Sequence, residues 1–175
     1  LFAKVQEGVR KHCPGMIVQF STGGRGRDQN QRGAMLFLKP DMASLATGSV
    51  NFPAQVYENP PDFVEGLART MLEYDIKPEV EVFDLAMLYN AANLVKKGLL
   101  KDPPHVQFVM GIQNAMPARR TIFDFLRSEL RGLLEHPILA PALSRLVLVT
   151  DDGAGYLGEQ GRVLRDHAGT VHALG

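Results

Sequence analysis

Two short polar segments carry hydroxyl and backbone groups that could bind an anion. Ser21-Thr22-Gly23-Gly24 follows an apolar run and offers two hydroxyls and backbone amides that a negative group can approach closely. Ser49 and Asn51 lie at the end of the next expected strand, and their side chains can hydrogen-bond a carboxylate or a carbonyl. Each segment alone also fits an ordinary turn, because glycine and serine are common turn residues. Their shared position at strand ends favours a binding site.

Two glutamates further along the chain could supply a general base. Glu79 and Glu81 alternate with Val80 and Val82, so the carboxylates share one face of a strand and the valines share the other. A buried carboxylate is costly unless it is paired, hydrated or bound to a cation. Ion pairs with Lys or Arg from neighbouring strands therefore remain the alternative. Glu81 lies closer to the carboxyl end of the strand, and we expect it to be the catalytic residue.

The sequence has no metal-ligand pair at a familiar spacing. It contains one Cys and five His residues, and no HxH, HExxH or comparable pattern occurs. His105 opens an expected strand, where a structural role is the better interpretation. We therefore expect no stoichiometric zinc site built from clustered His, Cys and carboxylate ligands.

A glycine motif near the end of the chain indicates a second kind of chemistry. Gly153 to Gly158 satisfies G-x-G-x-x-G after the apolar run 146–149, which is the order of a dinucleotide-binding βαβ unit. Against this interpretation, Asp151 and Asp152 place negative charge beside the pyrophosphate position, and no acidic ribose ligand follows. A glycine-rich barrel loop is the other interpretation, and both remain open.

Strands and helices must alternate to position these groups. Apolar residues at helical spacing predict helices at 1–12, 60–72, 85–97 and 122–135. Short apolar or alternating runs predict strands at 16–20, 41–52, 79–84, 105–110 and 146–149. This alternation is typical of an α/β fold with parallel strands.

A barrel fits the polar strand residues better than a doubly wound sheet, whose strands are apolar on both faces. Gln19 with Ser21, Glu79 with Glu81, and Gln107 with His105 place polar groups on one face, as a lumen allows. A complete (βα)8 TIM-type barrel needs about 250 residues. We therefore predict a single partial barrel domain over 1–175, holding roughly the middle strands. Residues 1–135 form its βα units and 136–175 a divergent glycine-rich tail.

Composition narrows the range of partners. The 175 residues are 45% hydrophobic, and 19 basic side chains balance 19 acidic ones. Nucleic acid and anionic membranes require clustered positive charge, so we expect neither partner. The single Cys13 fits a reducing cytoplasm, and we expect a cytoplasmic homo-oligomer. The chain begins at Leu1 without an initiator Met and within an expected helix, so we expect a segment to precede it.

Five stretches within residues 1–130 resemble the beta-keto acid cleavage enzymes, the group that includes 3-keto-5-aminohexanoate cleavage enzyme. In the order of that family they are Val18 to Gly24, Pro40 to Phe52, Tyr57 to Pro61, Lys77 to Asp84 and His105 to Gly111. The resemblance implies a zinc-dependent (βα)8 barrel that cleaves a short beta-keto acid in a retro-Claisen reaction with acetyl-CoA. The products would be acetoacetate and a new CoA thioester.

The same resemblance implies roles for individual residues. Ser21, Thr22, Gly23 and Gly24 would form the segment that holds the keto acid carboxylate. Ser49 and Asn51 would assist substrate binding, and Glu81 would be the acidic residue of the active site. The family binds zinc through a His-x-His pair on an earlier strand and a Glu in an Arg-x-Gly-x-Glu-Asp segment. This chain has neither, so its zinc ligands are not in this sequence.

The second half of the chain keeps two alternatives open. After residue 130 the motifs of the family end, and 146–174 resembles the opening βαβ unit of a short-chain dehydrogenase. An NAD(P)-dependent oxidoreductase or nucleotide-binding module centred on this tail is one alternative. A non-catalytic barrel fragment is the other. The favoured function is acyl-transferring cleavage of a beta-keto acid, with this chain an incomplete copy of the enzyme.

Overall fold

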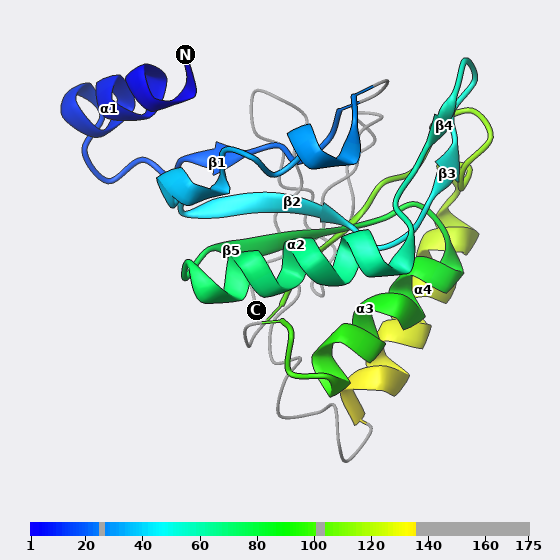
Figure 1. Ribbon diagram of the computed structural model, residues 1–175. Coiled ribbons are helices and arrows are strands. Elements are labelled where there is room, and N and C mark those ends of the chain that lie inside the picture. Colours follow the sequence, from blue (N-terminus) through cyan, green and yellow to red (C-terminus); the bar gives the residue numbers. More distant parts are fainter. Residues whose placement is uncertain (25–26, 101–103, 136–175) are drawn as a thin grey trace.

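Four parallel strands form one sheet whose spatial order is the order of the chain. The computed structural model describes residues 1–24, 27–100 and 104–135. Its sheet runs β1 (Gln19–Phe20), β2 (Met42–Ala46), β5 (Lys77–Val82) and β6 (His105–Phe108) (Figure 1). A doubly wound sheet reverses its strand order at a switch point, whereas successive barrel strands lie in sequence. The α/β class with parallel strands is confirmed, and the order favours part of a barrel.

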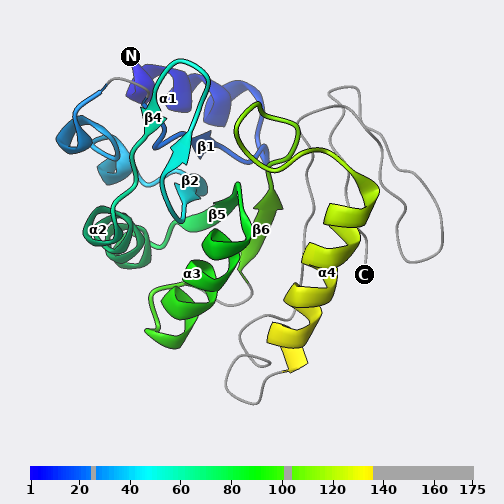
Figure 2. The same cartoon turned by 90° about the vertical axis from the view of Figure 1, so that its right-hand side faces the viewer.

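Helices follow three of these strands and cover one face of the sheet. α2 (Pro61–Glu73) and α3 (Leu85–Lys96) pack on it, and α4 (Arg120–Glu135) lies beside α3 (Figure 2). α2 begins with Pro at its first turn, where a missing N–H costs nothing. α3 begins at Asp84, whose side chain accepts a hydrogen bond from Met87 N at 2.9 Å. The sequence therefore predicts both helix starts correctly.

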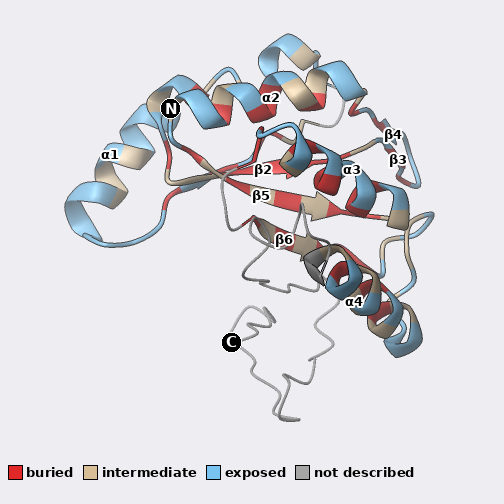
Figure 3. Ribbon diagram, turned by 90° about the horizontal axis from the view of Figure 1, so that it is seen from below, coloured by how far each residue is buried: buried red, intermediate tan, exposed pale blue. Residues whose placement is uncertain are grey.

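The two faces of β5 differ as its alternating pattern predicts. Val80 and Val82 are 0% exposed and belong to the core shared with the helices, whereas Glu79 and Glu81 are half-buried on the opposite face. The register pairs Glu79 with Ser44 and His105, and Glu81 with Ala46 and Gln107. Figure 3 shows α2 and α3 turning their buried residues toward the strands. One face thus holds the fold together, and the other carries the polar side chains.

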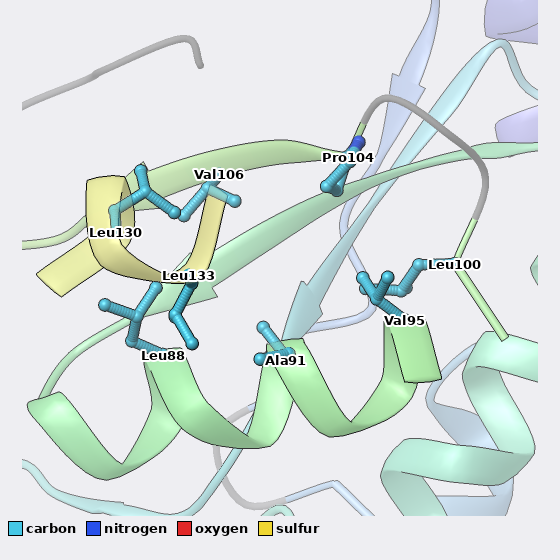
Figure 4. A pocket seen from close by; sticks show the side chains of 9 residues that line it. Leu88, Ala91, Val95, Leu100, Pro104, Val106, Leu130 and Leu133 are labelled. Atoms are coloured by element: carbon cyan, nitrogen blue, oxygen red, sulfur yellow. The ribbon is translucent and has the colours of Figure 1, made fainter. Parts of the chain in front are cut away.

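Apolar packing joins α3, α4 and β6. Leu88 and Ala91 of α3 face Leu130 and Leu133 of α4 across a space of only about 10 Å³ (Figure 4). A space of this size is at the lower end of the about 10–15 Å³ that one water molecule needs, so the seam is close to fully packed. This packing fixes α4 against the sheet.

α1 (Phe2–His12) precedes the sheet and attaches to it through a few contacts. Arg10 forms a bidentate ion pair with Asp41, with both N···O distances 2.9 Å. The rings of Phe2 and Phe20 pack edge to face with centroids 5.2 Å apart. None of the described helices is long and apolar enough to cross a membrane.

The predicted second strand, 41–52, is wrong in its second half. β2 ends at Ala46, and the chain then forms the antiparallel hairpin of β3 (Val50–Asn51) and β4 (Val56–Tyr57). Hydrogen bonds to α3 end the strand: Thr47 Oγ1 donates to the Met87 carbonyl at 2.8 Å, and Asn90 Nδ2 donates to the Thr47 carbonyl at 2.9 Å. The hairpin projects beyond the carboxyl end of β2 (Figure 1).

Other differences are matters of length or coverage. β1 holds two residues of the expected strand 16–20, and β6 ends at Phe108 instead of 110. His105 opens β6 at its amino end, as the sequence predicts. The expected strand 146–149 and the glycine motif at 153–158 lie outside the described residues.

Candidate functional site

The segment after β1 is attached to β2 through Thr22. Thr22 N donates to Ser44 Oγ at 2.9 Å, and Thr22 Oγ1 donates to the Ser44 carbonyl at 2.7 Å. Thr22 is 1% exposed, so its hydroxyl is used inside the protein. Thr22, one of the residues expected to bind substrate, therefore holds the segment in place. Its neighbours Ser21, Gly23 and Gly24 are more accessible to a ligand.

Ser21 and Ser49 are exposed and have the same hydrogen-bond arrangement. Ser21 Oγ accepts from Gly23 N at 3.1 Å, and Ser49 Oγ accepts from Asn59 N at 2.8 Å. A hydroxyl that accepts one backbone N–H still has its own proton to donate. Both serines can therefore donate a hydrogen bond to a ligand oxygen, which suits a carboxylate or a ketone.

The two glycines after Ser21 have little space for a side chain. A Cβ on Gly24 would lie 3.0 Å from Arg32 Cγ, and a Cβ on Gly23 would lie 3.0 Å from Ser21 Oγ. Contacts this short require the neighbouring atoms to move. Glycine at these positions leaves the backbone approachable from the exposed side, as an anion-binding segment needs.

A buried arginine, which the sequence patterns did not single out, supports these segments from inside. Arg32 is 7% exposed; its Nε donates to the Thr22 carbonyl at 2.9 Å, and one terminal nitrogen donates to the Glu58 carbonyl at 2.6 Å. The other terminal nitrogen donates to Asn59 Oδ1 at 2.6 Å. The only signal in the sequence was its place as the last of three arginines in a polar, glycine-rich loop, just before an apolar segment.

Asn59 continues these contacts toward Ser49. Its Nδ2 donates to the Gly48 carbonyl at 3.0 Å and to the Tyr57 carbonyl at 3.3 Å. Asn51, the remaining residue expected to bind substrate, lies exposed in β3, two positions beyond Ser49. The structure therefore joins the Ser21 and Ser49 segments through Arg32 and Asn59.

Glu81 lies at the carboxyl end of β5, beside the segment that leads to Ser49. Its carbonyl accepts from Thr47 N at 3.4 Å, and the register places Ala46 on one side and Gln107 on the other. Its side chain is on the sheet face opposite Val80 and Val82. This position at the carboxyl end of a parallel strand is where barrel enzymes place catalytic groups.

Glu79 lies on the same face, two residues before Glu81. Gln19 Nε2 donates to its carboxylate. Burial raises the pKa of Glu79, and the hydrogen bond from Gln19 offsets part of that increase.

The raised pKa of Glu79 makes stability depend on pH. Between the ordinary glutamate pKa and the raised one, the folded state binds more protons than the unfolded chain, so stability falls as pH rises. Glu79→Gln removes this penalty. Calorimetric scans measure the melting temperature of Glu79→Gln relative to that of the wild type at each pH. This difference should increase between pH 4 and pH 7, by roughly a few degrees at most. Glu73→Gln, at the exposed end of α2, is the control; an equal increase there contradicts the prediction.

The described residues do not fit the zinc that the family resemblance implies. No group of three or more His, Cys, Asp or Glu side chains within 1–24, 27–100 and 104–135 could hold a metal ion. A protein zinc site needs three or four such ligands. The described residues therefore supply no such ligand group.

Comparison with known proteins places this geometry in a family. A family model described as beta-keto acid cleavage enzyme matches residues 1–148, which extends the resemblance beyond residue 130, where the sequence motifs had placed its end. The chain is 56% identical over 132 residues to the 3-oxoadipate:acetyl-CoA acetyltransferase of Cupriavidus necator, covering 75% of this chain and 46% of that protein. It is 37% identical over 127 residues to the 3-keto-5-aminohexanoate cleavage enzyme of Acetoanaerobium sticklandii, covering 71% of this chain and 46% of that protein.

A solved structure agrees with the fold. The apo structure of ObcA superposes with a TM-score of 0.64 at 22% identity, covering 85% of this chain and 38% of that one. The chain spans about half the length of the curated relatives it matches. The family match over residues 1–148 and the identity to both relatives show that this chain belongs to the beta-keto acid cleavage enzyme family.

Proposed function

We propose that this chain carries the carboxylate-binding segment and the catalytic base of an enzyme that cleaves a short beta-keto acid with acetyl-CoA. The observation that carries the proposal is the arrangement at the carboxyl ends of β1, β2 and β5. There, Ser21 and Ser49 each accept a backbone N–H and keep a proton to donate, and Glu81 follows on the polar face. The family membership and the names of the relatives support the same reaction.

Each group has a defined task in this proposal. Ser21, Gly23 and Gly24 bind the carboxylate of the keto acid through a hydroxyl and backbone amides. Ser49 and Asn51 contact the ketone end of the substrate. Glu81 removes a proton from C2, the carbon between the ketone and the carboxylate, and later returns it.

The reaction exchanges one acyl group for another. The C2 carbanion attacks the thioester carbonyl of acetyl-CoA, a C–C bond forms, and the CoA thiolate leaves. The thiolate then attacks the original ketone carbon, and the bond between that carbon and C2 breaks. The products are acetoacetate, protonated by Glu81, and a new CoA thioester, so atoms and electrons balance.

A direct assay tests the proposal. The purified protein is incubated with 3-oxoadipate and acetyl-CoA, and acetoacetate and the new CoA thioester are measured together by mass spectrometry. We expect both products in equal amounts. Ser21→Ala should raise KM for the keto acid by about tenfold, as expected when one hydrogen bond to a charged group is lost. Ser128→Ala, on the exposed side of α4, is the control and should leave KM unchanged.

The outcome that contradicts the proposal is equally specific. If no acetoacetate forms, or if it forms at the same rate without acetyl-CoA, the acyl-exchange reaction is not the function of this chain. An equal KM in Ser21→Ala and Ser128→Ala would remove Ser21 from the binding site.

A further inference from the structure

Arg32 is a buried cation whose hydrogen-bond acceptors, among the residues that the structure describes, are all neutral. They are the carbonyls of Thr22 and Glu58 and the side-chain oxygen of Asn59. The guanidinium carbon also lies 4.8 Å from the ring centroid of Tyr57 and 4.6 Å from that of Phe63. Neutral acceptors and aromatic faces stabilise a guanidinium but do not cancel its charge. A positive charge therefore lies directly behind the backbone of the Ser21–Gly24 segment.

The same side chain connects the two loops that carry the serines. Its Nε holds the Thr22 carbonyl of the first loop, and Asn59, bound to its terminal nitrogen, holds the Gly48 carbonyl of the second. The backbone N–H of Asn59 in turn donates to Ser49 Oγ. A planar guanidinium with donors in fixed directions suits such a junction better than the flexible ammonium of lysine.

We infer that Arg32 is a positioning residue for carboxylate recognition: it fixes the Ser21 and Ser49 loops relative to each other and supplies the uncancelled charge that favours an anion there. This inference rests on the proposed function, because it concerns the same binding segment. It adds a residue that does not itself touch the substrate.

The substitution Asn59→Asp tests the charge with little change in shape. It places a carboxylate against the guanidinium, where Asn59 Oδ1 is now 2.6 Å away, and so cancels the positive charge. Asn90→Asp is the matched control, because it removes an equivalent amide donor to the Thr47 carbonyl and adds the same charge, without an Arg32 contact among its described hydrogen bonds. Binding of acetoacetate and of its uncharged methyl ester is measured by titration calorimetry, with melting temperature as the check on folding.

We expect Asn59→Asp to weaken acetoacetate binding about tenfold or more and to leave methyl ester binding nearly unchanged. Only the acetoacetate anion is attracted by the positive charge that the substitution cancels. Asn90→Asp should change neither binding constant by more than about twofold. The decisive readout is the acid-to-ester ratio, which is the binding constant of acetoacetate divided by that of the methyl ester. Loss of structure alone would weaken the binding of both ligands and leave this ratio unchanged. An unchanged ratio in Asn59→Asp overturns the inference.

A second pair of variants tests the same point if Asn59→Asp does not fold. Arg32→Gln removes the charge and should lower the acid-to-ester ratio, whereas Arg32→Lys keeps the charge and should preserve the ratio with weaker binding overall. Equal ratios in the two variants overturn the inference. Failure of the proposed function looks different: the wild type then binds acetoacetate with the expected ratio but gives no product with acetyl-CoA.

Discussion

Replacing Glu81 with glutamine should lower the turnover of beta-keto acid and acetyl-CoA by about 100-fold or more, which is the usual contribution of a general base. Glutamine has nearly the same shape but cannot take a proton. Because Glu81 is half-buried on the face away from the helix-packed core, the melting temperature should change little. Steady-state rates of acetoacetate formation measure the effect.

Glu79→Gln is the matched control for this experiment. It removes a carboxylate from the same face of the same strand, two positions further from the carboxyl end. We expect it to retain most of the turnover. Equal losses in the two variants would mean that the sheet face as a whole is disturbed, and equal activity in wild type and Glu81→Gln would show that this carboxylate is structural.

Replacing Gly33 with alanine should destabilise the protein by about 2–4 kcal/mol, through two separate effects. Gly33 has φ +77°, a left-handed conformation that costs a residue with a Cβ about 1–2 kcal/mol. A Cβ there would also lie 2.5 Å from Leu67 Cδ2, and Leu67 is one of the buried core residues of α2. Urea unfolding curves give the free energy directly.

Gly98→Ala separates the two effects. Gly98 has φ +67°, but a Cβ added there would meet no described atom within 4 Å, so only the backbone cost applies. Gly98→Ala should therefore lower the free energy of unfolding by about 1–2 kcal/mol. If Gly33→Ala lowers the free energy of unfolding by no more than Gly98→Ala does, the Leu67 side chain moves aside freely and the close contact causes no loss of stability.

Local patterns predicted the elements whose signals lie within a few residues. The period-two pattern of β5 placed its valines in the core and its glutamates on the other face, as the structure shows. Pro60 and Pro61 marked the start of α2, and the apolar spacing from Leu85 marked that of α3. Such features depend on the chain next to them, so they can be recognised without tertiary contacts.

The β3–β4 hairpin and Arg32 could not be predicted in the same way. The residues after Ala46 have strand-like composition, but hydrogen bonds to Met87 and Asn90, both on α3, end the strand. Arg32 is typical of an exposed loop residue in sequence; its burial depends on acceptors 26 and 27 positions later in the chain. Contacts between residues so far apart in the sequence produce no periodic pattern that can be recognised in the sequence.

The division of β5 into a packed face and a polar face has a consequence for how this scaffold can change over generations. Val80 and Val82 contribute to stability, whereas Glu79 and Glu81 point away from the helix-packed core. A mutation on the polar face should therefore change folding stability little, whereas one on the packed face should lower it. Selection can thus change the residues of the polar face in small steps while the architecture persists.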